Sequence, residues 1–186
     1  MRVADQVPWS GDTETTFRQD CGMQIRPAEA NDLDLILQMR LDFLDEVRGL
    51  APVETTSEFR AETRAFIHRT QQEDHLRTWI AEEHGDVLGI VSVVVHDVPP
   101  LPEDARSREG SIINEYVKPA ARGRGVGRLL LGAALGSAES LGIRRFFLFA
   151  TDAGKPLYIK EGFTPTDRYM VLPIPLGGPF VSTDSQ

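Results

Sequence analysis

Apolar side chains recur at helical spacing in two segments near the start of the chain. The first segment follows Asn31, a suitable N-cap, and ends near Gly49. Its apolar positions are Leu33, Ile36, Leu37, Leu41, Leu44 and Val47. The second segment can be capped by Thr56 or Ser57, and its inward positions are Phe59, Thr63, Phe66, Ile67 and Thr70. This spacing predicts two amphipathic helices, preceded by a short strand at residues 24–26.

Beyond these helices the apolar period shortens to that of a strand. Residues 76–82 and 87–95 are rich in apolar and β-branched side chains, and the turn-forming residues 84–86 separate them. This arrangement predicts an antiparallel hairpin. Residues 97–110 then form a long loop with three prolines, and residues 111–117 form the next strand. Loops of this length in a compact domain are often binding elements.

A glycine-rich stretch separates the strand at 111–117 from a further helix. Apolar positions at helical spacing begin near Val126 and end around Leu141, and Gly142 suits a left-handed C-terminal cap. The continuous apolar run at 145–150 predicts a strand that is buried on both faces. A helix that connects two neighbouring strands forms a crossover, so we expect these two strands to be parallel.

The end of the chain contributes two short elements. Pro156 lies in the first turn of a short helix that Gly162 ends, and residues 169–172 are predicted to form the last strand. The complete order predicts an α/β domain with a mixed, largely antiparallel sheet, one parallel βαβ crossover and helices on both faces.

The pattern also divides the chain into segments. We assign residues 1–22 to a flexible N-terminal extension, residues 23–174 to the folded domain and residues 175–186 to a C-terminal tail. Met1 and Met23 both remain candidates for the translation start.

Composition and charge narrow the class of protein. A net charge of −8 argues against general binding of nucleic acids, which requires the neutralisation of phosphates. No apolar stretch is long enough to span a membrane. A single cysteine, Cys21, fits a reducing compartment, so we expect a cytoplasmic protein. The four histidines show no metal-ligand spacing, and we expect no metal site.

Three arginines lie at the start of the helix that follows the glycines, namely Arg122, Arg124 and Arg128. Positive charges near a helix N-terminus oppose the macrodipole, and each costs about 0.3–1 kcal/mol when nothing compensates it. A bound anion is the simplest compensation, because the first amides of a helix are free to donate hydrogen bonds.

The spacing of the glycines decides between known phosphate motifs. A dinucleotide fingerprint needs a third glycine where this chain has Arg128 or Leu130, and a triphosphate loop needs Ser or Thr where Pro156 follows Gly154-Lys155. Both motifs are therefore absent. The remaining pattern is Arg122-x-x-Gly125-x-Gly127, between a strand and a helix.

This pattern resembles the acetyl-coenzyme A signature of the GCN5-related N-acetyltransferase (GNAT) family. The segments Asn114–Pro119 and Leu157–Phe163 are similar to the family's strand before the signature and its Leu-Tyr-x-x-x-Gly-Phe element after it. The resemblance implies a GNAT-like fold and acetyl-CoA as co-substrate. It also implies that the cofactor pyrophosphate binds the segment Arg122, Gly123, Arg124, Gly125, Val126, Gly127 and Arg128.

The resemblance also implies roles for single residues. Tyr158 occupies the position of the tyrosine that protonates the departing coenzyme A thiolate in the family. Tyr116 and Val117 lie on the strand whose backbone pairs with the pantetheine arm. Thr151 stands where the family often has asparagine, and Gly154 where it has alanine. A threonine hydroxyl retains the ability to hydrogen-bond the pantetheine.

A general base is harder to assign from sequence. The attacking amine must be neutral, so its proton needs an acceptor. Glu115 is the preferred candidate because it lies on the strand that contacts the cofactor; Glu82 and Glu83 near the hairpin turn are weaker ones. Ordered water is the alternative, since many family members use it.

Together these features predict an N-acetyltransferase that moves an acetyl group directly to an amine within a ternary complex. The acceptor is a small-molecule or peptide amine, and acidic residues on the first helix and in the 97–110 loop would suit a cation. Homodimers are common in the family, so the resemblance also allows a homodimer. The alternative is a non-catalytic acyl-CoA-binding or regulatory module.

Overall fold

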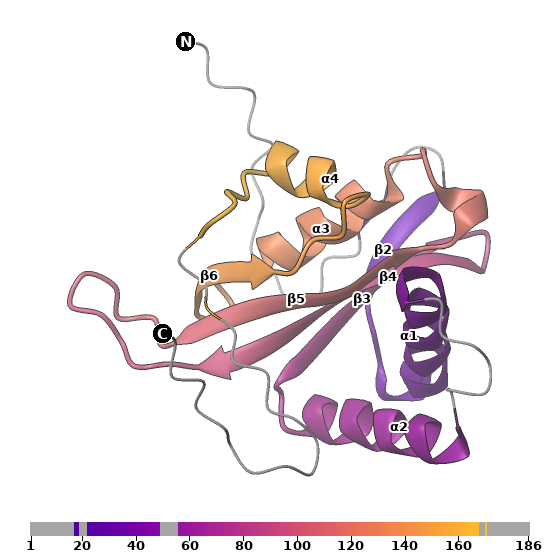
Figure 1. The fold of residues 1–186 in the computed structure, drawn as a ribbon, viewed down its shortest axis with the longest axis horizontal. Coiled ribbons are helices and arrows are strands. Elements are labelled where there is room, and N and C mark those ends of the chain that lie inside the picture. The colour runs from indigo at the N-terminus through magenta and orange to yellow at the C-terminus, as the bar shows by residue number, and fades with distance from the viewer. Residues whose placement is uncertain (1–16, 19–21, 49–55, 168–169, 171–186) are drawn as a thin grey trace, which may run out of the picture.

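The computed structural model describes residues 17–18, 22–48, 56–167 and 170 (Figure 1). Within these ranges the strands are β1 (Phe17–Arg18), β2 (Met23–Pro27), β3 (Leu76–Glu83), β4 (Asp86–Asp97), β5 (Arg108–Val117) and β6 (Ile143–Leu148). The α-helices are α1 (Leu33–Arg48), α2 (Ser57–Gln72), α3 (Val126–Gly136) and α4 (Lys155–Lys160). Two short 3₁₀ turns, Ala30–Asp32 and Pro119–Ala121, precede α1 and follow β5.

The strands form one sheet in the order β1-β2-β3-β4-β5-β6. Neighbouring strands are antiparallel except β5 and β6, which pair in parallel and are connected through α3. This topology confirms the predicted mixed sheet with one crossover. The antiparallel hairpin of β3 and β4 is also confirmed, with His84 and Gly85 both at positive φ in its turn.

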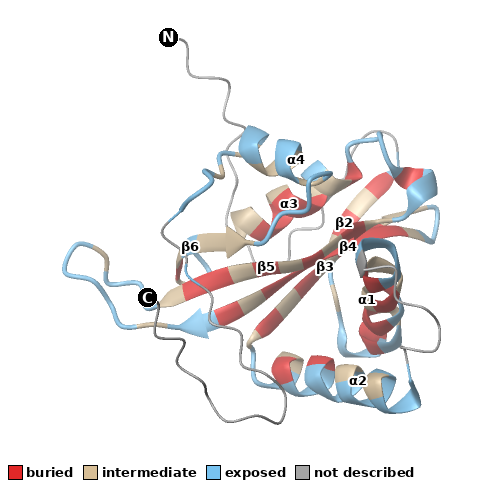
Figure 2. Ribbon diagram, viewed as in Figure 1, coloured by how far each residue is buried: buried red, intermediate tan, exposed pale blue. Residues whose placement is uncertain are grey.

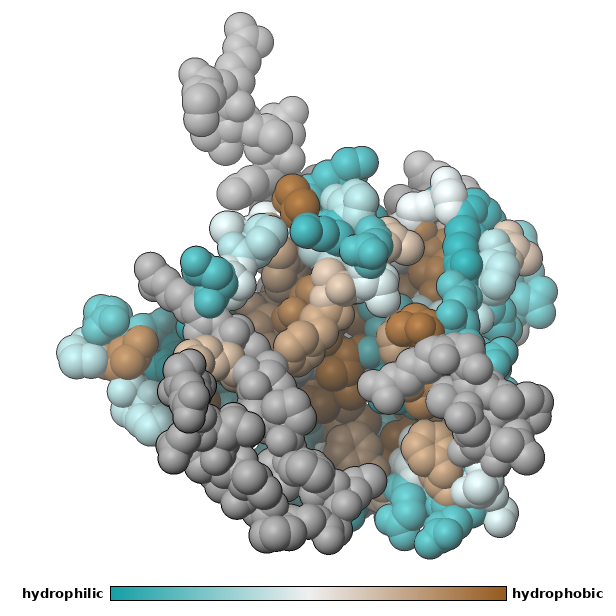
Figure 3. All heavy atoms as spheres, viewed as in Figure 1, coloured by the Kyte–Doolittle hydropathy of each residue, from teal (hydrophilic) through white to brown (hydrophobic). Residues whose placement is uncertain are grey.

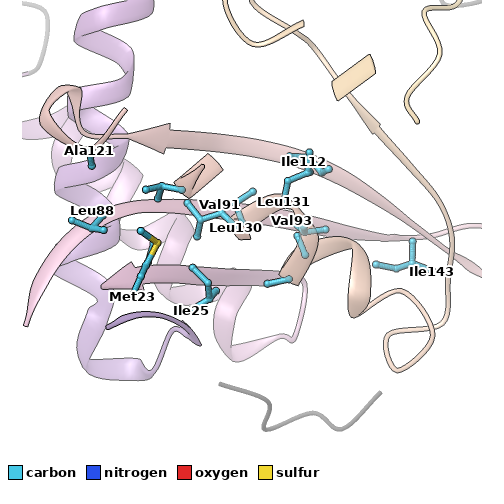
Figure 4. Close-up of a cluster of buried hydrophobic side chains, with 14 of the residues drawn as sticks. Met23, Ile25, Leu88, Val91, Val93, Ile112, Ala121, Leu130, Leu131 and Ile143 are labelled. Carbon is cyan, nitrogen blue, oxygen red and sulfur yellow. The ribbon is translucent and has the colours of Figure 1, made fainter. Parts of the chain in front are cut away.

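Helices cover both faces of the sheet, as predicted (Figures 1 and 2). On one face, α3 packs over β2–β5 around a core that includes Ile25, Val91, Leu130 and Leu131 (Figure 4). On the other face, α1 and α2 enclose a second core. The sheet therefore separates two apolar layers, and a side chain on β5 belongs to one layer or the other.

Local hydrogen bonds set the starts of the first two helices. The Asp32 carboxylate accepts a hydrogen bond from the Glu29 backbone N–H at 2.7 Å, so the cap before α1 begins at Glu29 rather than at the expected Asn31. Thr56 caps α2 by accepting a hydrogen bond from the Phe59 N–H at 3.1 Å. This second cap is one of the two residues that the sequence left open.

Helix α3 is shorter than its apolar pattern suggests. It ends at Gly136. The Ser137 hydroxyl donates to the Ala134 carbonyl at 2.6 Å and so competes with the backbone N–H that would bind this carbonyl in a longer helix. Residues 137–142 form turns, and Gly142 has φ +64°, so the expected left-handed glycine closes those turns and not the helix. The prediction of a helix to residue 141 was therefore wrong.

Strand β6 is the edge strand among the described residues, and only its first residue, Ile143, is buried; this contradicts the prediction of burial on both faces. It ends at Leu148, and Phe149 beyond it is 72% exposed. An apolar run alone does not distinguish a central strand from an edge strand. The predicted last strand, 169–172, lies outside the described residues except for Met170, which is not in a strand.

The predicted N-terminal extension and C-terminal tail lie almost wholly outside the described residues. The exception is β1, which pairs with β2 through Phe17 opposite Ile25 and so extends the sheet into the predicted extension. Within the described part of the chain no helix could cross a lipid bilayer. The cytoplasmic location stays a prediction.

Strands β4 and β5 approach closely at Gly89, so a side chain at this position should destabilise the fold. A Cβ atom there would lie 2.6 Å from the Tyr116 carbonyl oxygen and 3.1 Å from the Val117 Cα atom. Because both contacts are backbone, we expect Gly89→Ala to lower the unfolding free energy by about 2 kcal/mol in urea titrations.

Gly110→Ala is the matched comparison for Gly89→Ala. Its Cβ would meet only side chains, the nearest being the Phe146 ring at 2.6 Å, and a ring can turn away. We therefore expect the smaller loss at Gly110. An equal or smaller loss at Gly89 would contradict the backbone explanation.

Candidate active site

Strands β5 and β6 separate part-way along their length. Their pairing ends at Ile112 opposite Leu148, whereas β5 continues to Val117. In the same region β4 shifts register against β5, from Ile90 opposite Tyr116 to Ser92 opposite Ile113, which leaves one extra residue on β5. Asn114 at this bulge has φ +55°, a conformation that asparagine tolerates better than most residues. The last residues of β5 thus have an edge that β6 does not cover.

Backbone direction distinguishes Tyr116 from Val117. The Lys118 N–H donates to the Leu88 carbonyl on β4 at 2.9 Å. Because backbone groups alternate in direction along a strand, Tyr116 also bonds towards β4, and the N–H of Val117 points to the uncovered edge. Of the two residues predicted to contact the pantetheine arm, the geometry favours Val117 and disfavours Tyr116.

The start of α3 lies beside this edge. Gly123 and Gly125 have φ of +74° and +81°, and nothing lies within 4 Å of the Cβ that either could carry. Glycine at 125 therefore fits the left-handed turn before α3, and the open space around it leaves room for a ligand to approach the backbone. At Gly127 the crowding is real, since a Cβ would lie 3.2 Å from Glu115 Oε1 and 3.4 Å from Leu157.

All three arginines around the glycine-rich turn have carboxylate partners. Arg122 binds Glu46 on α1, Arg124 binds Glu83 on β3 at 2.6 Å, and Arg128 binds Glu161 after α4 at 2.8 Å. Arg122 also donates from Nε to the Val117 carbonyl at 3.0 Å. The fold thus supplies carboxylates from three other elements that compensate these charges, and the binding of an anion at the same turn stays a prediction.

Glu115 and Tyr158, the predicted base and acid, lie together. The Tyr158 hydroxyl is hydrogen-bonded to the Glu115 carboxylate, and both residues are half-buried on the α3 face of the sheet. Burial raises the pKa of Glu115 to about 7, and the hydrogen bond from Tyr158 offsets only part of this rise. Burial and the neighbouring carboxylate raise the pKa of Tyr158 well above its usual value.

Two buried polar atoms at the bulge have no hydrogen-bond partner among the described residues, Asn114 Oδ1 and Glu115 Oε2. An unpaired buried polar atom normally costs about 1–3 kcal/mol, so such atoms are often found at ligand sites. Sequence analysis did not single out Asn114. The available signal was an asparagine in a strand, a residue type that strands disfavour and that suits a bulge.

Short-range contacts hold Tyr158 in place. Its ring lies edge-on to Phe163 with centroids 5.9 Å apart, and a Cβ at Gly154 would lie 3.1 Å from it. The Thr151 hydroxyl accepts a hydrogen bond from the Gly154 N–H at 3.1 Å, at the start of α4. Thr151 therefore helps to begin α4 and keeps its own hydroxyl proton available for a ligand.

The Tyr116 side chain lies in the other layer. It contacts Phe43 edge-on at 6.5 Å between centroids, and the Arg122 guanidinium lies 5.9 Å from the ring centroid. Burial is the main cause that raises the pKa of Tyr116, followed by nearby acids of α1, namely Asp42, Glu46 and Asp45. The site thus has an aromatic and acidic side formed with α1, separated by the sheet from Glu115 and Tyr158.

A cavity of about 960 Å³ lies between β6, α4 and the segment after α4. Its lining includes Phe147, Leu148, Tyr158, Ile159 and Phe163. Figure 3 shows a hollow in the viewed face of the molecule, with apolar residues at its bottom. In the part of the chain that the structure describes, no cluster of three His, Cys, Asp or Glu side chains forms a metal site.

Comparison with known proteins identifies the family. The model of the acetyltransferase (GNAT) family matches residues 41–163, well over half of the chain. The chain belongs to the GNAT family. A predicted acetyltransferase from Clostridium acetobutylicum, solved with acetyl-CoA, is 28% identical with a TM-score of 0.72 and covers 81% of this chain and 96% of that one.

Two further GNAT relatives show the range of similarity. A GCN5-related N-acetyltransferase from Ralstonia eutropha is 31% identical with a TM-score of 0.71, over 82% of this chain and 99% of that one. A mycothiol acetyltransferase from Amycolatopsis mediterranei is 35% identical in an alignment 101 residues long; the match covers 49% of this chain and 33% of that protein. This GNAT chain therefore spans about a third of the length of that curated relative.

The buried carboxylate makes a prediction about pH and stability. Because folding raises the pKa of Glu115 from 4.5 to about 7, the folded protein holds a proton that the unfolded chain has released. Binding of this proton adds about 3 kcal/mol to the unfolding free energy. The added stability is fully present below pH 4.5 and is lost as the pH rises through 7.

The measurement is urea unfolding of the wild type and Glu115→Gln at pH 4.5 and pH 8. We expect the stability of the wild type, relative to that of the variant, to fall by about 3 kcal/mol between these pH values. Glu139→Gln at an exposed position is the control and should track the wild type. Parallel pH dependence of the wild type and Glu115→Gln would refute the assignment to Glu115.

Proposed function

We propose that this chain is an acetyl-CoA-dependent N-acetyltransferase that transfers the acetyl group directly to an amine in a ternary complex. The proposal rests on one observation: three features of the site lie beside one another. They are the uncovered edge of β5, the glycine turn that opens α3 and the buried Tyr158 hydroxyl. Membership of the GNAT family and the relative solved with acetyl-CoA support it.

The residues fit the proposed co-substrate. The amides from Gly123 to Arg128 open a helix and are suited to a pyrophosphate. The Val117 N–H on the uncovered edge is the donor that we assign to the pantetheine arm or the thioester carbonyl. Thr151 retains a hydroxyl proton for the same arm. When bound, acetyl-CoA supplies an activated acetyl thioester.

Tyr158 is the residue to which we assign proton donation to the departing thiolate. An ordinary tyrosine has a pKa of about 10 and a thiol about 8.5, so the transfer is uphill by roughly 2 kcal/mol. The buried site makes Tyr158 a weaker acid still, because burial and the Glu115 charge both favour the protonated phenol. A tyrosine in this setting is fully protonated before the reaction, as a proton donor must be.

We assign an amine as the acceptor, in a small molecule or a peptide. The carboxylates of α1 add negative charge near the site, which would favour a cationic acceptor. The curated relative is named a mycothiol acetyltransferase, and this chain spans about a third of its length, so the acceptor of this chain is identified by direct test.

The test is incubation with acetyl-CoA and a panel of polyamines, amino acids, aminoglycosides and peptides, with thiol release followed continuously. We expect thermal stabilisation by acetyl-CoA and turnover with at least one amine. Stabilisation without turnover on any amine would favour the alternative, a non-catalytic acyl-CoA-binding module. Sedimentation of the same samples tests the expected homodimer.

A further inference from the structure

One face of the sheet carries a row of side chains that crosses three strands. Val94 on β4 lies opposite Ser111 on β5, and Ser111 lies opposite Phe147 on β6. Residues that pair across neighbouring strands share a face of the sheet. Val94 packs against the core formed with α1 and α2, so Phe147 lies on this α1/α2 face. Its neighbour Phe146 instead packs in the α3 layer.

Phe147 and Ile113 flank the start of the gap between β5 and β6 on the α1/α2 face. The last pair of the two strands is Ile112 with Leu148. Phe147 therefore lies one residue before the end of the pairing, and Ile113 lies one residue beyond it. Ile113 packs against the same core as Val94, and both Ile113 and Phe147 are only partly buried. The mouth of the gap on this face is thus apolar and open to a ligand.

His96 adds a second ring to this mouth. The His96 ring stacks on the Phe147 ring, with centroids 5.9 Å apart and an angle of 25° between the planes. Strands β4 and β6 lie two strand spacings apart, about 10 Å, so the two rings lean towards each other over β5. The hollow in Figure 3 opens beside α1 and α2. We call Ile113, His96 and Phe147 the gap wall.

The opposite face of the gap is closely packed. On the α3 side, a Cβ at Gly127 would lie 3.2 Å from Glu115 Oε1, and a Cβ at Gly154 would lie 3.1 Å from the Tyr158 ring. Tyr158, to which we assign proton donation, packs against the core on this side. An amine that attacks in the gap therefore enters from the α1/α2 face and passes the gap wall.

The gap wall lies within reach of an amine with a short side chain. Ile113 is two residues from Glu115 on β5, which is about 7 Å along a strand. Five single bonds cover about 6.5 Å in an extended chain, at about 1.3 Å for each bond. A group attached to the nitrogen through four carbon atoms would therefore contact Ile113 and Phe147.

The acidic groups near the gap wall are already paired. The Glu109 carboxylate binds both Arg144 and Arg145, and Asp97 binds Arg108. A second ammonium group placed against the wall would lose hydration, and these carboxylates are already bound to arginines. The wall therefore favours an uncharged apolar group over the distal charge of a polyamine.

We propose that the acceptor is a primary amine that carries an aromatic group on a short alkyl chain, and that this group packs against the gap wall. The inference rests on the proposed acetyltransferase function and adds the class of acceptor. The reacting nitrogen lies in the gap, and the ring contacts Phe147 and Ile113. Phe147 thus determines specificity, because the apolar area that it buries depends on the acceptor's side chain.

The first test compares three amines with the wild-type protein and acetyl-CoA. We expect kcat/KM for 4-phenylbutylamine to be at least about tenfold higher than for n-butylamine, because the ring adds buried apolar area. A diamine of similar length, 1,8-diaminooctane, should react no better than n-butylamine. Equal kcat/KM values for 4-phenylbutylamine and n-butylamine would overturn the inference.

The second test changes the wall itself. Phe147→Ala should lower the ratio of kcat/KM for 4-phenylbutylamine to kcat/KM for n-butylamine by at least about fivefold. Phe147→Leu keeps an apolar side chain and should retain most of the ratio. Phe146→Ala is the matched control, since it removes the same ring from the opposite face of β6 and should leave the ratio within about twofold. A ratio that Phe147→Ala does not change would contradict the wall.

The third test needs neither turnover nor a variant. 4-Phenylbutylamine is titrated into the wild-type protein, and the methyl resonances of Ile113 and Val94 are followed by NMR. We expect both to shift, and the Ile159 methyl on α4 to stay in place, although Ile159 is 51% exposed. Shifts confined to Ile159 would place the ring in the cavity beside α4 and overturn the inference.

These outcomes separate the two proposals. Turnover of n-butylamine without any preference for 4-phenylbutylamine would reject the gap wall and keep the acetyltransferase. Absence of turnover with every amine would reject the acetyltransferase proposal, and the methyl shifts would still decide whether the wall binds an apolar group.

Discussion

Tyr158→Phe is expected to lower kcat by about 10²–10³-fold while the KM for acetyl-CoA changes less than about threefold. The substitution removes one hydroxyl and keeps the ring that packs on Phe163 and against Gly154. Steady-state thiol release with the best amine of the panel measures the effect. The loss reports proton donation because the fold and the glycine turn of α3 are unchanged.

Tyr116→Phe is the matched control for this experiment. Its hydroxyl lies on a ring that packs on Phe43 in the opposite layer of the domain, so we expect a much smaller decrease in kcat. Turnover of Tyr158→Phe within threefold of the wild type would show that Tyr158 is not the acid. Water would then be the proton donor.

The second large effect concerns the helix that carries the glycine turn. Leu130 on α3 is fully buried in the core between the helix and β4. Leu130→Ala removes three carbon atoms from a packed interior, and we expect the unfolding free energy to fall by about 3 kcal/mol. Urea unfolding followed by tryptophan fluorescence measures this change, since Trp79 packs against the same core.

Leu129→Ala on the same helix provides the comparison. Leu129 is only half-buried, so its truncation should cost less than half as much. Equal losses at the two positions would mean that α3 packs differently from the structure. A loss below about 1 kcal/mol at Leu130 would contradict its place in the core.

Much of the fold follows from local sequence patterns. The hairpin of β3 and β4 was predicted because its strands are β-branched and its turn holds Gly85. The parallel pairing of β5 and β6 was predicted because a helix joins them. These features depend on residues near one another in the chain, which is why periodicity and turn residues are sufficient to predict them.

The errors have a common cause. The length of α3 was overestimated because its apolar spacing continues past Gly136, where the Ser137 hydroxyl competes for the helical carbonyl. Strand β6 was expected to be buried on both faces because its side chains are apolar, yet among the described residues only Ile143 of this edge strand is buried. The hydropathy of a segment shows that it tends to be buried, but it does not show which other segments pack against it.

The arginines show the same limit at the candidate site. Their positions at the helix start suggested an unpaired positive cluster. The fold brings Glu46, Glu83 and Glu161 to them from α1, β3 and the end of α4. Surface ion pairs of this kind contribute little to stability, but together these three orient the arginines around the turn.

Local patterns along the chain were sufficient to predict the order of the elements, the glycine turn before α3, the resemblance to GNAT enzymes and Tyr158 as the candidate acid. The folded chain was needed to show that the N–H of Val117, and not that of Tyr116, faces the uncovered edge, and that Glu115 lies beside Tyr158. The bulge at Asn114 on β5 and the position of Tyr158 on α4 set these relations. They depend on strand register and on contacts between distant segments, which one-dimensional spacing does not encode.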